Sequence, residues 1–272
     1  DNIKSVLHFA NSHNGLKSDS IRLSQFQIVN SFYQKNNFRG VWSKKENWKP
    51  IADSMFSFIK QSKYYGLYPE DYHYNQLDSL RVKIQNDSLV RMDAVAWTKA
   101  DLMLSDAFMN TLKDLKEGRL LPDSLSIISK KSFIDSFFIP TQDKAILSGN
   151  LSGIFDSIEP ANHEYVALRH ALKGFADSMN TRKYQYIQYP YNDTVSFNKN
   201  LYKRLLQSGL GKPALAIPDS VTISNLVKEY QAKHKLKADG KPGQGTVSTL
   251  NSNDNEKFRR IAITLDRYKQ LH

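Results

Sequence analysis

The stretch LVKEYQAKHKLKADGKPGQGTVSTLN, residues 226–251, decides the fold of the C-terminal part of the chain. Apolar and aromatic side chains recur at helical spacing at its beginning, at Leu226, Val227, Tyr230 and His234. This spacing places them on one face and predicts an amphipathic helix of about three turns. We expect the helix to end at Leu236, because a turn signal follows.

A glycine-rich loop comes next. It contains the turn-forming residues Asp239, Gly240, Pro242 and Gly243. Because proline fixes φ and glycine accepts positive φ, these residues predict a tight connection. Thr246 is expected to cap a short second helix that buries Val247 and Leu250. The stretch therefore predicts two helices joined by a loop that glycines hold in shape.

The spacing of this stretch resembles the second half of a peptidoglycan-binding domain. The matching positions are Tyr230-Gln231, His234, Leu236, Asp239-Gly240, Gly243, Thr246 and Leu250-Asn251. Two departures stand out: Lys235 occupies a position where the family usually has glycine, and Lys241-Pro242 replaces a small aliphatic pair. The alternative interpretation is a generic helical hairpin with a glycine-rich link.

The resemblance implies peptidoglycan, as glycan strand or stem peptide, for the ligand. Loop N–H groups in residues 240–245 and at the start of the second helix are natural donors to an anion. Tyr230 is as easily a core residue as a contact. The candidate binding residues are Tyr230, Gln231, His234, Asp239, Gly240, Gly243 and Thr246.

Composition narrows the classes of protein to consider. The chain has 272 residues, 40% of them hydrophobic, a formal net charge of +11 and no cysteine. It therefore contains no disulfide, no thiolate metal site and no cysteine nucleophile. The positive charge favours polyanionic partners such as nucleic acid, acidic lipid or cell-wall polymer. No apolar run approaches the roughly 20 residues of a membrane span.

Nucleic acid is the partner that the net charge alone would suggest. The lysines and arginines are spread along the chain, and no helix gathers them on a face that could enter a groove. We therefore expect no nucleic-acid partner. Salt-dependent DNA binding would revive this alternative.

The first 180 residues carry helical periodicity with glycine and proline punctuation, and few alternating strands. Helices are predicted from Ser24, which would cap its helix, from Pro50 to Gly66, over residues 89–116 and after Pro160, with shorter pieces between 123 and 159. The helix over residues 89–116 carries an apolar stripe from Met92 to Leu115, and we expect it to stop at Gly118. Together with the C-terminal stretch, this predicts an all-α chain. We expect a multi-helix scaffold bundle followed by a three-helix domain.

Four segments of this region resemble the helical scaffold of large exported L,D-transpeptidases. They are FYQKNNFRGVW (32–42), YYGLYPEDY (64–72), DAFMNTLKDLKEGRLLP (106–122) and YVALRHAL (165–172). In that family a peptidoglycan-binding domain follows the scaffold, and a catalytic domain of the YkuD type comes last. Residues 197–210 resemble the first helix of the binding domain, and residues 258–271 the helix that leads to the catalytic domain.

The resemblance implies a domain order and a function. We expect a scaffold over residues 1–182, a Tyr-rich connector over 183–195, a peptidoglycan-binding domain over 196–252 and a lead-in helix over 253–272. L,D-transpeptidases act through a cysteine paired with a histidine, and this chain has no cysteine. We therefore expect the non-catalytic portion of such an exported enzyme, trimmed before its catalytic domain. It would position that domain on murein in the periplasm during cell-wall cross-linking.

The rival interpretation is a stand-alone cell-wall adaptor without enzymatic activity. A downstream reading frame of about 200 residues with a histidine and a cysteine would favour the enzyme.

The connector, KYQYIQYPYND over residues 183–193, admits two interpretations. Its tyrosines could stack on sugars. Alternatively, an extended linker would bury them against both flanking domains, and this is the interpretation we favour.

Other chemistry finds little support in the sequence. His163 and His170 lie seven residues apart without a third ligand, and Glu164 lies among helix-surface residues without a catalytic motif. We predict no catalytic residue, no metal site and no cofactor within these 272 residues.

Overall fold

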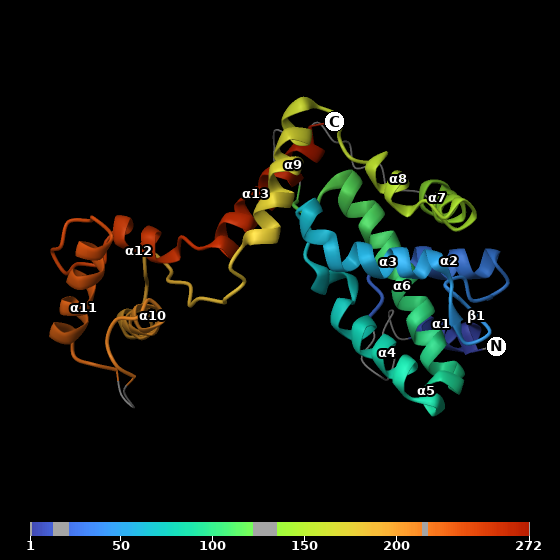
Figure 1. Cartoon of the computed structure of the whole chain (residues 1–272), viewed down its shortest axis with the longest axis horizontal. Helices are drawn as coiled ribbons and strands as arrows, with labels where there is room; N and C mark the ends of the chain where they lie inside the picture. The colour runs from blue at the N-terminus through green and yellow to red at the C-terminus, as the bar shows by residue number, and fades with distance from the viewer. Residues whose placement is uncertain (1, 13–21, 122–134, 214–216, 272) are drawn as a thin grey trace. The chain divides into compact units, whose positions relative to one another are not determined.

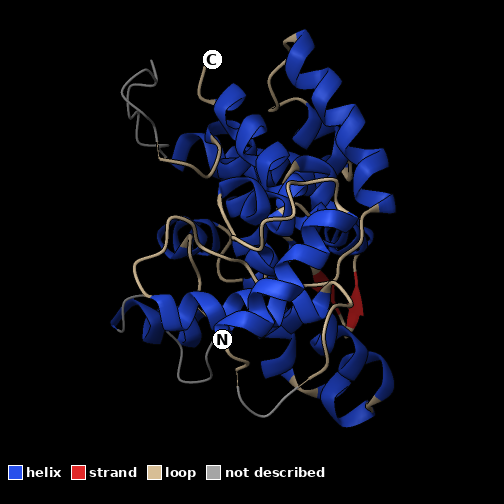
Figure 2. Cartoon of the chain, turned by 90° about the vertical axis from the view of Figure 1, so that its left-hand side faces the viewer, coloured by secondary structure: helices blue, strands red, loops and turns tan. Residues whose placement is uncertain are grey.

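The computed structural model describes residues 2–12, 22–121, 135–213 and 217–271. The chain is mainly helical, as predicted, and the strands of the described residues form one short antiparallel hairpin (Figure 2). It divides into two compact units. Unit 1 comprises Asp1–Ala176 with Ile261–His272, and unit 2 comprises Asp177–Arg260.

The elements of unit 1 run from the N-terminus to α9. They are α1 (Asn2–Ser12), α2 (Phe26–Lys35), β1 (Ser43–Lys44), β2 (Asn47–Trp48), α3 (Pro50–Gln61), η1 (Ser62–Tyr65), η2 (Pro69–Tyr72), α4 (Tyr74–Asn86), α5 (Ser88–Met92), α6 (Ala94–Glu117), α7 (Asp135–Ser148), α8 (Leu151–Asp156) and α9 (His163–Ser178). Those of unit 2 are α10 (Thr194–Gln207), α11 (Ser220–Lys233) and α12 (Gln244–Asn251). Helix α13 (Asp254–Lys269) begins in unit 2 and ends in unit 1.

Helix α6 is the centre of unit 1, with α1 to α5 and α7 packed on it (Figure 1). Its buried apolar residues include Leu104, Phe108, Leu112 and Leu115. A helix covered on several sides needs apolar residues around most of its circumference, and α6 has them from Ala96 to Leu115.

The long helix predicted over residues 89–116 is two helices. Asp93 adopts an extended conformation and its carboxylate accepts the Val95 N–H, so it ends α5 and caps α6. Asp87 caps α5 in the same way, through the Leu89 N–H. The predicted apolar stripe is also too long, since Met92 is 70% exposed. The periodicity of apolar residues does not reveal an aspartate that caps a new helix within the repeat.

A buried carboxylate ties the segment before β1 to α6. Asp101 accepts hydrogen bonds from the Tyr33 hydroxyl (2.5 Å), the Val41 N–H (2.9 Å) and the Trp42 N–H (3.1 Å). The Trp42 indole N–H donates to Ser105 at 2.8 Å. Burial raises the pKa of Asp101 and raises that of Tyr33 well above its usual value. This network fixes VW of the FRGVW segment against the central helix.

A second buried aspartate explains why Ser24 is not a helix cap. The Ser24 hydroxyl and the Gln25 N–H both donate to Asp106 (3.1 and 2.7 Å), and α2 begins at Phe26 without a side-chain cap. His73 Nε2 lies 2.7 Å from the same carboxylate. The capping prediction from sequence was therefore wrong, because the serine has a partner 82 positions away.

The C-terminal half of α13 packs in unit 1. The Lys269 ammonium is buried and donates to the Asp114 carbonyl (3.0 Å) and to Asp266 (3.2 Å). The Gln270 amide donates to the Leu120 carbonyl at 2.6 Å. These contacts bind the end of α13 to the end of α6 and to the GRLL turn that follows.

Two further predictions concern helix ends. The helix from Pro50 stops at Gln61 and continues as η1 to Gly66, whose φ of 71° ends it. Between residues 123 and 159 the structure contains α7 and α8, and residues 122–134 lie outside the described residues.

None of the described helices combines the length and apolarity that a bilayer span requires.

Unit 2 has its own core. Its residues come from α10, α11, α12, the segment before α10 and the turn after it, and they are Ile187, Phe197, Leu201, Leu205, Leu210, Ile223, Val227, Tyr230, Val247 and Leu250. Three helices around one apolar centre place the predicted binding stretch, residues 226–251, on unit 2 as α11, a loop and α12.

Candidate functional site

Helix α11 ends in a Schellman motif. The Leu236 N–H donates to the Gln231 carbonyl (2.8 Å) and the Lys235 N–H to the Ala232 carbonyl (3.2 Å). Lys235 has a φ of 57°, the left-handed conformation that usually calls for glycine. The chain thus places a lysine in a backbone conformation that favours glycine.

Gln231 organises the loop that follows. It is 2% exposed, and its Nε2 donates toward Asp239 Oδ1 (3.1 Å), the Lys241 carbonyl (3.0 Å) and Thr246 Oγ1 (3.0 Å). Its Oε1 accepts the Gly240 N–H at 2.9 Å. One side chain of α11 thus holds both sides of the loop and the first turns of α12.

Gly240 is the position at which the loop comes closest to α11. Its φ is 75°, and a Cβ there would lie 2.3 Å from Ser224 Oγ. The Ser224 hydroxyl donates to the Gly240 carbonyl at 3.2 Å. Both the positive φ and the close approach require glycine at this position.

Thr246 has a different role from the one predicted. Helix α12 begins at Gln244, with Gly243 at the N-cap position and no side-chain cap. Thr246 lies inside the helix, is buried, and accepts from Gln231. Its hydroxyl is therefore an internal partner of the loop, and the prediction that it caps the helix was wrong.

The predicted anion donors are partly occupied by the protein. The Gly240 N–H is bound to Gln231, the Lys241 N–H to Asp239 (2.9 Å) and the Gly243 N–H to the Lys241 carbonyl (2.8 Å). These three amides stabilise the loop.

The candidate residues divide into a buried and an exposed group. Tyr230, Gln231, Gly240 and Thr246 are buried, while His234 and Asp239 are exposed and Gly243 is half-buried. The Tyr230 ring stacks on the His234 ring with centroids 4.1 Å apart. Burial raises the pKa of Tyr230, against the opposing charge of Arg204. Four of the seven candidates are therefore buried within unit 2, and the other three are at least partly accessible to solvent.

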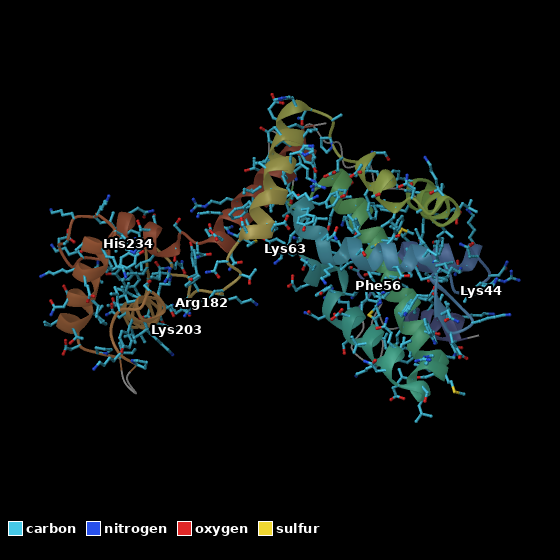
Figure 3. The ribbon with its side chains drawn as sticks, viewed as in Figure 1. Lys44, Phe56, Lys63, Arg182, Lys203 and His234 are labelled. Carbon is cyan, nitrogen blue, oxygen red and sulfur yellow. The ribbon has the colours of Figure 1, made fainter. Side chains whose placement is uncertain are left out.

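Four exposed lysines lie at the end of α11 and in the loop that follows. Lys233, Lys235, Lys237 and Lys241 are all exposed and lie within nine residues of sequence. We call these four the lysine patch. His234, labelled in Figure 3 at the end of α11, lies among them in sequence. Unit 2 carries 14 Lys and Arg against 7 Asp and Glu, so it holds most of the net charge of +11.

The Tyr-rich segment before α10 is anchored at one apolar residue. Ile187 is fully buried, and Asn251 at the end of α12 accepts its N–H (3.0 Å) and donates to its carbonyl (2.7 Å). The Arg204 guanidinium lies over the Tyr184 ring, with its Cζ atom 4.4 Å from the ring centroid. The segment is therefore part of the fold of unit 2.

Three tyrosines of this segment are partly exposed. Tyr186 is 60% exposed, Tyr191 is 43% exposed and Tyr189 is 37% exposed. These three rings are therefore not buried in the core of unit 2. Successive side chains of an extended segment point to opposite faces. Ile187, between Tyr186 and Tyr189, therefore faces the core of unit 2.

The sequence reasoning missed Arg204 and Asn251 as structural partners. Arg204 is buried on α10, its Nε donates to the Leu250 carbonyl at 2.9 Å, and burial lowers its pKa. A usable signal for Arg204 is its position three residues after the core residue Leu201. Asn251 carries no such signal, because its partner lies 64 positions away.

Within the ranges that the structure covers, no three or more His, Asp or Glu side chains gather as metal ligands would. His163, Glu164 and His170 are exposed on α9.

Two comparisons with known proteins bear on unit 1. A family model described as Scaffold domain matches residues 27–172, which is more than half of the chain and extends from α2 to α9. No curated protein matches the chain.

Proposed function

Because the chain belongs to the family described as Scaffold domain, we propose that it is the non-catalytic scaffold and peptidoglycan-binding portion of an L,D-transpeptidase. Unit 1 is the scaffold and unit 2 binds murein. In this proposal the chain works in the periplasm and holds a catalytic domain on its polymer. None of the 272 residues is a cysteine, so the thiolate that attacks the stem peptide belongs to that other domain.

The observation that carries the proposal is the loop held by Gln231. Its four hydrogen-bond partners are residues of the pattern that resembles a peptidoglycan-binding domain, or their neighbour Lys241. The residues of this pattern thus form the hydrogen bonds that hold the loop in one conformation. Its exposed side presents the lysine patch and the His234 ring.

The chemistry of the lysine patch fits the stem peptide better than the glycan. Stem peptides carry carboxylates, and four ammonium groups in a short stretch attract them over a distance of about one Debye length. Exposed ion pairs contribute little each, in the range of about 0–1 kcal/mol, so a single contact is weak. Retention on an insoluble polymer then depends on many weak contacts at high local concentration.

A sedimentation experiment tests this proposal. The whole chain is mixed with purified insoluble peptidoglycan and centrifuged, at low and at physiological salt. We expect the chain in the pellet, with less retained at higher salt. A variant with Lys233→Gln, Lys235→Gln, Lys237→Gln and Lys241→Gln is expected to remain mostly in the supernatant.

The control removes the same charge from unit 1. Lys44, Lys45, Lys60 and Lys83 are exposed, and their replacement by Gln lowers the net charge equally. This variant is expected to sediment like the parent. Equal loss in both variants would reduce the effect to net charge, and a parent chain that stays in the supernatant would refute the proposal.

A further inference from the structure

We propose that unit 2 contains a second binding site, a pocket for one N-acetylated sugar ring formed by the Tyr-rich segment and the first turns of α10. The pocket has a volume of about 170 Å³. Its lining residues are Ile187, Gln188, Tyr191, Asn192, Asp193, Ser196, Phe197 and Asn200. The choice of a cell-wall glycan as the polymer rests on the proposed function, whereas the site itself rests on the geometry below.

The first argument is an aromatic platform. The Tyr191 ring stacks on the buried ring of Phe197, with centroids 4.1 Å apart and planes at 21°. Phe197 belongs to the core of unit 2, so the platform is fixed, while 43% of Tyr191 stays exposed. An exposed ring held in this way can pack against the C–H face of a pyranose, because its π-system carries negative charge on its faces.

The second argument is a set of amide side chains without partners. Gln188, Asn192 and Asn200 line the pocket, and within the described residues no hydrogen bond involves their side chains. Each can donate and accept at the same time. Sugar hydroxyls and acetamido groups also donate and accept, so amides beside an aromatic ring match this chemistry.

The charge at the pocket argues for a neutral ligand. Asp193 caps α10, and the hydrogen bond from the Ser196 hydroxyl, together with those from the Val195 and Ser196 N–H groups, holds its pKa below the usual 3.8. A carboxylate that stays ionised repels phosphate and peptide carboxylates. The site therefore favours the glycan, whereas the lysine patch favours the anionic stem peptide.

The pocket is preformed. Ile187 lines it and is fully buried, and Asn251 binds both the N–H and the carbonyl of Ile187. A site that is already ordered loses little conformational entropy on binding, which matters for a ligand as small as one ring.

The test uses the whole ¹⁵N-labelled chain and a trisaccharide of β-1,4-linked N-acetylglucosamine without peptide. We expect chemical-shift changes of the amides of Gln188, Tyr191, Asn192 and Asn200 that saturate in the millimolar range. The double variant Asn192→Ala, Asn200→Ala is expected to weaken binding about tenfold. Tyr191→Ala should abolish it.

Two matched controls lie outside the pocket. Asn198→Ala changes an amide on the same helix, and Tyr186→Ala removes an exposed ring of the same segment. Both are expected to bind the trisaccharide like the parent. Because Tyr191→Ala also removes packing on Phe197, the asparagine variants decide the outcome.

The results separate this inference from the proposed function. If the chain sediments with peptidoglycan but the trisaccharide shifts no pocket amide, or shifts only residues 233–241, the sugar site is refuted alone. If the trisaccharide binds the pocket and the chain does not sediment, the site stands and the proposed function fails. Equal binding by the asparagine variants and the parent would also refute the site.

Discussion

Gln231 shows how one buried amide can set the shape of a surface loop. Its side chain satisfies the Gly240 N–H and contacts three acceptors, although the loop itself is largely exposed. A buried polar group that loses its partner costs about 1–3 kcal/mol. The loop conformation therefore depends on one residue of α11 as well as on Gly240.

Replacing this residue tests that dependence. Gln231→Met keeps the volume but leaves the buried Gly240 N–H without an acceptor. We expect unit 2 to lose about 2–3 kcal/mol of unfolding free energy. Hydrogen exchange of peptides from residues 220–251 measures the loss.

The control for this prediction is Gln244→Met. Gln244 is exposed at the start of α12, so its replacement should change exchange little. Unaltered protection in Gln231→Met would show that the hydrogen bonds of this side chain do not hold the loop.

Lys235 offers the opposite test, a stabilising substitution. Its φ of 57° is costly for a residue with a side chain and accessible to glycine. We expect Lys235→Gly to stabilise unit 2 by about 0.5–1 kcal/mol in urea denaturation, net of the entropy that glycine loses. Lys237 has no positive φ, so Lys237→Gly should be neutral or destabilising. Destabilisation by both would argue against the left-handed cap.

At the scale of elements, the break between α5 and α6 has an identifiable cause. Asp93 is extended and caps α6, and Trp97 donates its indole N–H to the Arg91 carbonyl at 2.7 Å. The carbonyl at the end of α5 is thus satisfied by a side chain of α6. The Asp93 cap and the hydrogen bond from Trp97 to Arg91 join the two helices. The residues that make these contacts therefore specify the break.

Removal of this cap should cost stability in unit 1. Asp93→Ala is expected to lower the unfolding free energy by about 1 kcal/mol, the usual value of an N-cap. Tryptophan fluorescence during urea denaturation measures it, since Trp42, Trp48 and Trp97 all lie in unit 1. Asp78→Ala on the exposed side of α4 is the control and should leave the midpoint unchanged.

For the whole molecule, the two units should respond differently to acid. In unit 2, hydrogen bonds from the backbone or neighbouring side chains lower the pKa values of four carboxylates below 3.8, at Asp193, Asp219, Asp239 and Asp254. A lowered pKa in the folded state means that unfolding takes up protons. The stability that these groups provide is present above their unfolded values and is lost as the pH falls through the folded ones.

In unit 1 burial raises the pKa values of Asp101 and Asp114. The pH dependence of stability then has the opposite sign, because the folded state binds protons more readily than the unfolded state. Their effect on stability is favourable at low pH and diminishes as the pH rises through the raised values. We therefore expect amide resonances of unit 2 to lose dispersion before those of unit 1 between about pH 4 and 2. Earlier loss in unit 1 would contradict this assignment of signs.

Much of the helical architecture follows from local patterns. The periodicity of α3, α9 and α11, the turn at Asp239-Gly240 and the stop at Gly118 are properties of neighbouring residues, and the structure contains them at or near the predicted positions. The capping predictions at Ser24 and Thr246 failed for one reason. Each hydroxyl has a distant partner, Asp106 in one case and Gln231 in the other.

The candidate binding residues were chosen from a sequence pattern, and a pattern does not separate residues that shape a site from residues that meet a ligand. Gln231 and Thr246 fit the pattern because they hold the loop, and the exposed lysines beside them depart from it or lie between its positions. The pocket at Tyr191 could not be derived from sequence, because it depends on which of several alternating side chains faces inward.

Local patterns are enough to establish that the chain is helical, that it contains no cysteine and that residues 226–251 form two helices around a tight loop. These properties follow from composition and from the conformational preferences of adjacent residues. The tertiary structure decided that Ile187 is buried while Tyr186 and Tyr191 are exposed, and that the polar groups of Asp101, Asp106 and Gln231 face inward. Burial and hydrogen bonding join residues tens of positions apart, so only the folded chain fixes them.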